Sequence, residues 1–485
     1  MTHPNSSSSH PACGLLIFGV IAIFLTGCAV GPNYKRPRVD APLVYRGSPA
    51  DQTTHTGVAA TSLGDANWWD VFQDKELQKL EKTALEQNYD VRVAAKRVLE
   101  ARAQLGVTRA DQMPSLSAGG AESNQRNPAV GTTPGYQVTE GQTTLAVAWI
   151  PDFWGQYRRA TEAARANLLA KDWARQAVIS TVVADVAIGY FQLRELDLEL
   201  EIARNTLASR KESLELTRTL TDHGFDTMLD VRQAEELVYT AAAQVPDLER
   251  QIEQQENSLS ILLGNNPGPI SRGLKLTEQP HPPQVPAGIP SALLERRPDI
   301  REAEASLIAA NAKIGVAKAA YFPQISLTGT AGYESSSLGS LFTSPAGVWT
   351  FAGSLTQPIF EGGRLRSNVR LSEAQRDEML LTYQQTIQSA FRDVSNGLVA
   401  YRKYRESRIQ QEHLTDSAHE ALQLSQIRFK SGTSDYLEVL TNDTNYFNDQ
   451  LLLVQAQFNE LQTLVQLYQA LGGGWQSPHS PNIAP

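Results

Sequence analysis

The sequence contains little of what marks several familiar protein classes. It has only two cysteines in 485 residues, Cys13 and Cys28, too few for a disulfide framework or a cysteine-rich zinc site. Its eight histidines are scattered, and no phosphate loop, nucleophile elbow or zinc-ligand spacing is present. We therefore expect no enzyme, no catalytic residue and no metal site. The net charge of −9 argues against a nucleic-acid partner, because a nucleic-acid binder normally carries a basic patch.

Long hydrophobic runs are also missing beyond the N-terminus. A membrane-spanning helix needs about 20 apolar residues, and the mean hydropathy of the chain is −0.31. Any passage through a membrane must then use strands or an attached lipid. The one apolar run, residues 14–25, is too short to span a bilayer and predicts a secretory signal peptide over residues 1–27.

The signal peptide ends in Leu25-Thr26-Gly27-Cys28, which resembles a bacterial lipobox. This resemblance implies cleavage before Cys28 and a covalent lipid on that residue, S-diacylglycerol with N-palmitoyl, as the only prosthetic group. Ala29 in the next position implies sorting to the outer membrane. The alternative is an ordinary signal peptide followed by an incidental cysteine. Because Cys13 would be removed with the signal peptide, the mature chain would have no disulfide.

Residues 28–67 are rich in proline, threonine, serine and glycine, and they predict an extended arm behind the lipid. A first repeat follows over residues 68–264. Its pattern predicts a helix over 68–110, strands over 115–126 and 143–150, and a long helix that turns at Gly224 and returns to Leu263. Pro246 should kink the return helix or mark a junction in it.

The same pattern then recurs. Residues 265–297 form a proline-rich linker, residues 298–472 form a second repeat, and residues 473–485 form a flexible tail. The second repeat turns at Gly432, which is 208 positions after Gly224, and Pro323 follows Pro114 by 209 positions. Matching landmarks at one nearly constant offset predict an internal duplication.

Two strands per repeat give four strands per chain, too few to close a barrel with a lumen. Three chains would supply twelve strands and leave room for a pore. The predicted fold is therefore a mixed α and β membrane protein, a trimeric duct whose shared barrel continues into a barrel of long helices. Four aromatic residues lie near strand ends and suit either an interfacial girdle or ordinary packing, namely Tyr136, Trp149, Tyr333 and Trp349.

Four further motifs are shared with one family: Gly31-Pro32-Asn33-Tyr34-Lys35-Arg36-Pro37, Pro151-Asp152-Phe153-Trp154-Gly155, Arg296-Arg297-Pro298-Asp299-Ile300 and Gln357-Pro358-Ile359-Phe360-Glu361-Gly362-Gly363. Together with Cys28 they resemble the outer membrane efflux lipoproteins of resistance-nodulation-division systems, which are TolC-like outer membrane factors. The resemblance implies a homotrimer in outer membrane lipid that extends into the periplasm. It also implies two partners, a periplasmic adaptor protein and an inner-membrane pump, and a passive role as the exit duct for drugs or other small toxic molecules.

The resemblance also implies a gate at the helical tips, where Gly224, Gly432 and Ser434 would meet the adaptor. The family's paired acidic ring corresponds here to Glu438 and Thr441, so only one acid is retained, and Asp435 or Asp443 could contribute instead. Of the family's tyrosine, arginine and aspartate latch only Asp230 is matched. Arg428 or Arg232 could supply the missing guanidinium. Alternatively, an apolar ring at Leu437 could close the lumen.

One rival reading from another class remains, a lipid-anchored periplasmic coiled-coil lipoprotein of structural or adaptor type without a pore. It accounts for the long helices but for neither the strands nor the duplication. The cargo cannot be read from the sequence. The few methionines and the single, lipid-modified cysteine disfavour a dedicated exporter of soft metal ions.

Overall fold

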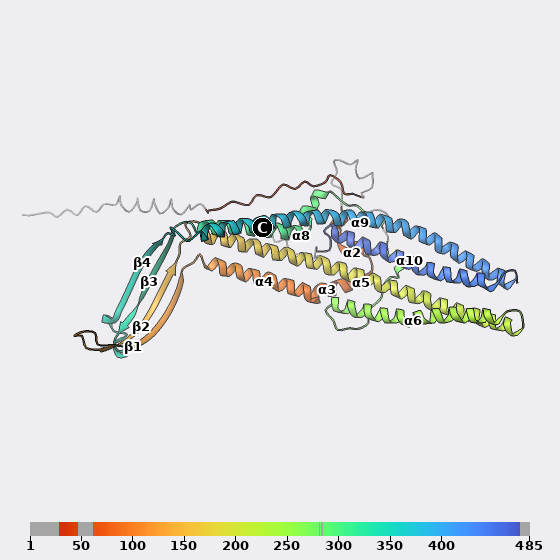
Figure 1. Cartoon of the computed structure of the whole chain (residues 1–485), viewed down its shortest axis with the longest axis horizontal. Helices are drawn as coiled ribbons and strands as arrows, with labels where there is room; N and C mark the ends of the chain where they lie inside the picture. The colour runs from red at the N-terminus through yellow and green to blue at the C-terminus, as the bar shows by residue number, and fades with distance from the viewer. Residues whose placement is uncertain (1–28, 47–61, 281, 283–284, 476–485) are drawn as a thin grey trace, which may run out of the picture. The chain divides into compact units, whose positions relative to one another are not determined.

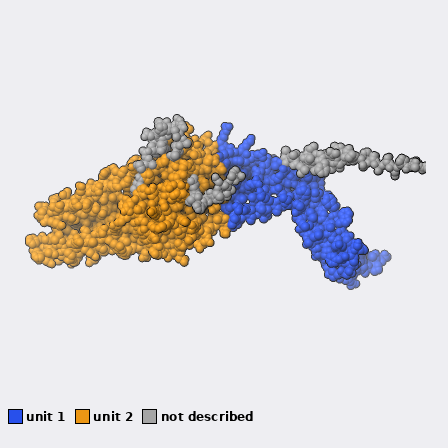
Figure 2. Space-filling model, turned by 180° about the vertical axis from the view of Figure 1, so that it is seen from behind, with its two compact units in different colours: residues 1–38, 98–171, 303–383 blue, residues 39–97, 172–302, 384–485 orange. Residues whose placement is uncertain are grey.

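The computed structural model describes residues 29–46, 62–280, 282 and 285–475. The predicted signal peptide, Cys28 and residues 476–485 of the predicted tail lie outside the described residues. The chain divides into two compact units (Figure 2). Unit 1 comprises residues 1–38, 98–171 and 303–383, and unit 2 comprises residues 39–97, 172–302 and 384–485.

Unit 1 contains a four-stranded antiparallel sheet with the strands in sequence order (Figure 1). The strands are β1 (Ser115–Asn127), β2 (Tyr136–Trp149), β3 (Gln324–Ser335) and β4 (Gly347–Thr356). Two short 3-10 turns, η5 (Leu338–Ser340) and η6 (Ser344–Ala346), lie in the connection between β3 and β4. The predicted strand pairs are confirmed, although β2 begins seven residues earlier than expected.

The sheet has one apolar face and one polar face. Strand residues alternate between faces, and the register places Leu116 opposite Val147 and Leu145 opposite Ala331. The same register groups these residues on one face: Leu116, Ala118, Leu145, Val147, Trp149, Leu327, Ala331, Trp349, Phe351 and Leu355. The other face carries small polar residues such as Ser117, Thr144, Thr328 and Ser354. The apolar face is largely exposed within one chain.

The N-terminal arm docks on unit 1 in an extended conformation. Val30 N donates to Trp154 O at 3.0 Å, and Arg159 donates to Asn33 Oδ1 at 2.7 Å. Gly31 lies so close to the helix beneath it that a Cβ there would come within 2.5 Å of Gly315 Cα. Residues 30–33 of the arm therefore bind a defined surface of unit 1.

The structure corrects one prediction, because residues 68–110 do not form a single helix. They form α2 (Trp68–Val71), α3 (Lys75–Gln87) and α4 (Tyr89–Ala110). Asp74 starts α3 by accepting from Glu76 N at 2.9 Å, and Asn88 starts α4 by accepting from Asp90 N at 2.8 Å. Each break is thus an N-cap that a continuous hydrophobic pattern conceals.

The duplication is visible in two helix junctions of unit 2. Asn88 Nδ2 donates to Leu262 O at the end of α6 (Met228–Leu262) at 2.8 Å. In the second repeat, Arg297 donates to Ala470 O at the end of α10 (Tyr436–Ala470) at 3.2 Å. Asn88 and Arg297 are 209 positions apart and therefore occupy equivalent positions in the two repeats. Each donates to a carbonyl at the end of a long helix, Asn88 through a side-chain amide and Arg297 through a guanidinium. Arg297 precedes α8 (Pro298–Ala319) and pairs with Asp299 at 2.6 Å.

The two longest helices, α5 (Gln156–Asp222) and α9 (Arg364–Lys430), have 67 residues each. Within unit 2 they form antiparallel hairpins with α6 and α10 (Figure 1). Pro246 lies inside α6 and does not divide it. In the described part of the chain, α5 alone is long and apolar enough to span a membrane, but over half of its most apolar stretch is buried in the protein, as in a core helix.

The two hairpins share a hydrophobic core near their tips. Its buried members come from α5, α6, α9 and α10, namely Leu214, Val231, Ala234, Val238, Leu422, Tyr436 and Val439. The remaining elements of unit 2 lie outside the hairpins: η2 (Leu63–Asp65), η3 (Leu276–Glu278), η4 (Pro290–Ala292) and α7 (Leu293–Arg296). The shared core fixes the tips of the two hairpins with respect to each other.

Candidate gate at the helical tips

Both hairpin tips use the same turn. Gly224 has φ 78° and Gly432 has φ 70°, a left-handed backbone that favours glycine. In the first tip, Gly224 N donates to Thr221 O and Phe225 N to Leu220 O, both at 2.9 Å. The second tip repeats this pair of bonds at Gly432 and Thr433. These are Schellman turns, which end a helix by satisfying its last carbonyl groups.

The two tips restart their helices differently. Thr227 and Asp230 form a capping box at the start of α6, in which Thr227 N donates to Asp230 Oδ2 at 3.1 Å. Asp435 occupies the N-cap position of α10 without a side-chain capping bond. Asp230, the one residue that matches the family's latch, is therefore engaged in capping its own helix.

Asp226 and Asp230 interact at the first tip. Partial burial, together with a side-chain hydrogen bond to Asp230, raises the pKa of Asp226 to about 6. The pKa of Asp230 is lowered, because the hydrogen bonds from Thr227 and Asp226 outweigh the opposing effect of burial. The two carboxyl groups therefore differ in protonation between about pH 4 and 6.

At the second tip the gate candidates Arg428 and Glu438 pair with each other. Arg428 Nη1 lies 2.8 Å from Glu438 Oε1, and this partly exposed bridge joins the end of α9 to the start of α10. Thr441 donates its hydroxyl to Leu437 O at 2.8 Å within α10 and supplies no negative charge. Leu437 is 59% exposed in the single chain. Arg428 thus lies with Glu438 rather than with Asp230, and the part of these residues in closure stays a prediction.

A buried ion pair that the sequence did not reveal lies behind the tips. Arg210 Nε of α5 is 2.6 Å from Asp443 Oδ2 of α10, and Arg210 Nη1 donates to Leu237 O of α6 at 3.1 Å. The Arg210 guanidinium also lies 5.0 Å from the centre of the Phe447 ring. Asp443, considered above as a gate acid, is therefore engaged inside the protomer. No local pattern marks the pair, because its two residues belong to different repeats.

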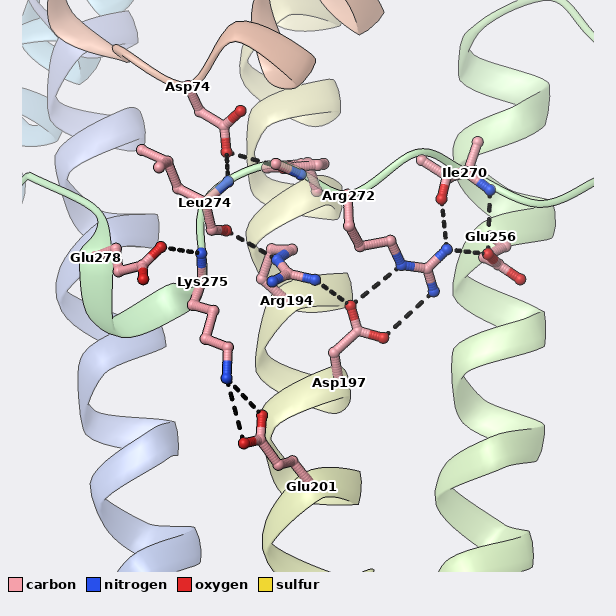
Figure 3. A network of polar contacts seen from close by, with 12 residues as sticks. Asp74, Arg194, Asp197, Glu201, Glu256, Ile270, Arg272, Leu274, Lys275 and Glu278 are labelled. Carbon is pink, nitrogen blue, oxygen red and sulfur yellow. Dashed lines mark hydrogen bonds and ion pairs between the residues drawn. The ribbon is translucent and has the colours of Figure 1, made fainter.

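A second polar cluster lies where the linker after α6 crosses α5 and α6 (Figure 3). Asp74 Oδ2 accepts from Tyr190 OH at 2.9 Å, Leu274 N at 2.9 Å and Gln279 Nε2 at 3.0 Å. Beside it, Arg272 bridges Asp197 and Glu256. These contacts hold the linker on the helices. Among the described residues, no group of three or more histidine, cysteine, aspartate or glutamate side chains could hold a metal ion.

Comparison with known sequences and structures agrees with this architecture. The sequence model of the outer membrane efflux proteins matches the chain twice, over residues 80–265 and 289–473. The chain belongs to the outer membrane efflux protein family. The double match confirms the internal duplication.

Relatives of this outer membrane efflux protein align along nearly their whole length. The toluene efflux pump outer membrane protein TtgC of Pseudomonas putida is 37% identical over 470 residues, which cover 95% of this chain and 96% of TtgC. The cation efflux system protein CusC of Escherichia coli is 33% identical over 469 residues, covering 96% and 99% of the two chains.

Solved structures show the same fold. The open-state outer membrane channel MtrE of Neisseria gonorrhoeae matches with a TM-score of 0.84 and 32% identity, over 93% of this chain and 99% of MtrE. A CusC structure matches with a TM-score of 0.83 and 32% identity, over 92% and 100%. The predicted TolC-like fold is confirmed. This outer membrane efflux protein is a channel of the outer membrane that serves efflux, and its family is one of channels rather than enzymes.

Proposed function

We propose that three copies of this chain form the exit duct of a tripartite efflux system. The duct passively conducts small toxic molecules that an inner-membrane pump delivers through a periplasmic adaptor. Cys28 carries the lipid that anchors the arm, and the hairpin tips form the adaptor-docking and gating end.

The sheet of unit 1 is the observation that carries the proposal. Its outer strands, β1 and β4, pair on one side only, which leaves two open edges. Lipid cannot satisfy the hydrogen-bonding groups of an open edge, so β4 of one copy must pair with β1 of another. One face is apolar and the other is lined with small polar residues, as expected for a wall between lipid and a water-filled lumen.

Three copies fit the lumen better than one or two. Four strands per chain give twelve for a trimer, whereas eight strands leave an interior that side chains fill. The duplication supports the same arrangement, because a ring of three duplicated chains contains six similar wall segments.

The named relatives differ in cargo, since TtgC belongs to a toluene efflux pump and CusC to a cation efflux system. A passive duct with a small polar lining does not require a dedicated binding site. We therefore assign selectivity to the pump, with solvent-like or antibiotic-like small molecules as the cargo class.

Planar-bilayer recording of the full-length protein, combined with electrophoresis of heated and unheated samples, tests the proposal. We expect a heat-sensitive trimer band and discrete ion-conducting steps. A monomer that remains lipid-anchored but conducts no ions would overturn it and favour the coiled-coil lipoprotein reading.

A further inference from the structure

Unit 1 contains two copies of one small structural pattern. Each repeat has one turn between its short helix and its first strand. The first turn is residues 111–114 of the first repeat, and the second turn is residues 320–323 of the second repeat. Each repeat also has one short linker between its second strand and its long helix. The first linker is residues 150–155, and the second linker is residues 357–363; both are distinct from the proline-rich linker after α6. These four segments lie at the helical end of the sheet.

Each repeat makes the same contact inside its own strand pair. Trp149 Nε1 donates to Gln112 O at 3.0 Å, and Gln357 Nε2 donates to Tyr321 O at 3.1 Å. The donors are 208 positions apart and the acceptors 209, which are the offsets of the duplication. The repeats are therefore equivalent here in contacts as well as in sequence.

The first linker makes a further contact that reaches the other repeat. Trp154 stacks on Phe322 of the second turn, with ring centres 4.8 Å apart, and Trp154 Nε1 donates to Pro323 O at 2.7 Å. This contact follows from the pairing of β2 with β3, which brings the first linker, directly after β2, beside the second turn, directly before β3.

The second linker occupies the equivalent position, and Met113 and Pro114 of the first turn correspond to Phe322 and Pro323. Glu361 stands where the first linker has Trp154, so Ile359 and Phe360 would have to supply the apolar contact. Within one chain the second linker cannot make this contact, because β4 and β1 are the two outer strands of the sheet. Its apolar residues stay exposed, Ile359 at 96% and Phe360 at 88%, and Met113 is 68% exposed. Exposed apolar residues of the second linker and of the first turn thus lie at opposite edges of the sheet.

We propose that Ile359 and Phe360 of one subunit pack on Met113 and Pro114 of the next subunit. The inference rests on the proposed trimer, because it requires β4 to lie beside β1 of a second copy. Three contacts of this kind alternate with the three internal Trp154–Phe322 contacts and close a ring of six around the channel. Docking on a second copy, rather than on lipid, follows because the equivalent first linker docks on protein.

Disulfide cross-linking of the full-length protein in its membrane tests the proposal. The parent chain has only Cys13 and Cys28 and gives the background. For the double variant Met113→Cys/Phe360→Cys we expect reducible dimers and trimers on denaturing gels after mild oxidation, in at least fivefold excess over either single variant. The pair Met113→Cys/Ile359→Cys serves as a second variant should the first fail to fold.

A matched negative control places the cysteine at the far end of the same strand. Val130 follows β1 and is exposed like Met113. The pair Val130→Cys/Phe360→Cys should give no ladder. A ladder as strong as that of the Met113 pair would show collisional cross-linking and overturn the inference.

A barrel-edge pair separates failure of the inference from failure of the proposed function. Val147 of β2 pairs with Gly329 of β3. Leu355 lies 208 positions after Val147, and Gly120 lies 209 positions before Gly329. Leu355 of one subunit should therefore pair with Gly120 of the next subunit. If Gly120→Cys/Leu355→Cys cross-links while both Met113 pairs fail in heat-sensitive trimers, the contact is wrong and the channel stands. If no pair cross-links and no trimer forms, the proposed function fails.

Labelling of Phe360→Cys in the trimer by a membrane-restricted maleimide would place the second linker in lipid and also overturn the inference.

Discussion

Arg210 of α5 and Asp443 of α10 form a buried ion pair that ties the two hairpins of unit 2 together behind their tips. Arg210 is 3% exposed, and its guanidinium contacts α6 through Leu237 O as well as the ring of Phe447. One side chain therefore links three helices. Any opening of the tips that separates the two hairpins must therefore break this ion pair. An opening that keeps the pair intact must move both hairpins together.

Removal of either partner should weaken the link between the hairpins. In Arg210→Met or Asp443→Leu the remaining charge would be buried without its partner, which typically costs about 3–5 kcal/mol. The double variant Arg210→Met/Asp443→Leu should recover much of this loss. The melting temperature of the trimer, followed by its heat-sensitive band, is the measurement.

The exposed pair Arg204–Glu249 provides a matched control for this experiment. It joins α5 to α6 at 2.6 Å, but its side chains are 57% and 46% exposed. Arg204→Met should cost no more than about 1 kcal/mol. Equal effects at Arg210 and Arg204 would contradict a special role for the buried pair.

Leu437 and Glu438 should set the resting aperture if the second tip closes the channel. Glu438→Ala removes the bridge to Arg428 and leaves an unpaired positive charge at the tip, and Leu437→Ala removes an exposed apolar side chain. We expect each variant to raise the single-channel conductance in planar bilayers. Thr441→Val, which removes only a hydroxyl bound to its own helix, is the control. Wild-type conductance in both alanine variants would exclude these residues from the gate.

The features that the sequence predicted well depend on local patterns. Alternation over residues 143–150 and 325–333 predicts strands because successive side chains face opposite ways. Gly224 and Gly432 mark the tips because few other residues tolerate a positive φ. Both patterns occur twice along the chain at the repeat offset, which supports each of these predictions.

The features that the sequence missed depend on contacts between distant segments. The hydrophobic pattern continues on both sides of Asn88 and predicts one helix, whereas the structure uses Asn88 both as the N-cap of α4 and as a donor to Leu262 O, 174 positions away. Arg210 and Asp443 lie 233 positions apart in different repeats. For the gate, the family pattern identified Glu438 but could not show that its partner is Arg428.

Asp226 should make the first tip sensitive to pH. Its folded pKa of about 6 lies above the ordinary value of 3.8, so the folded tip holds a proton that the unfolded tip releases. The tip is therefore destabilised as pH rises from about 4 to 6, with no further change above. The Asp230 carboxyl has the opposite effect on the stability of the tip. Because its folded pKa is lowered, it stabilises the tip as pH rises, and it does so at lower pH than the Asp226 transition.

Hydrogen exchange of residues 220–230, corrected for the intrinsic pH dependence, measures this effect. Asp226→Asn should protect the tip relative to the wild type at pH 7 and match it at pH 4. Asp230→Asn removes the negative charge that favours the protonated form of Asp226 and should shift the Asp226 transition toward lower pH. Identical exchange in wild type and Asp226→Asn at pH 7 would refute the shifted pKa.

Asp74 should be the most sensitive residue of the polar cluster in Figure 3. It is 1% exposed, and its two oxygens accept from Glu76 N, Leu77 N, Tyr190 OH, Leu274 N and Gln279 Nε2. Asp74→Ala leaves several buried donors without acceptors, at about 1–3 kcal/mol each. We expect loss of the trimer band, and Asp74→Asn should lose less because it retains one oxygen acceptor. Asp70→Ala, at an exposed acid four residues earlier, controls for charge. If the Asp74→Ala and Asp70→Ala trimers have the same melting temperature, the docking of the linker after α6 does not depend on the Asp74 carboxylate.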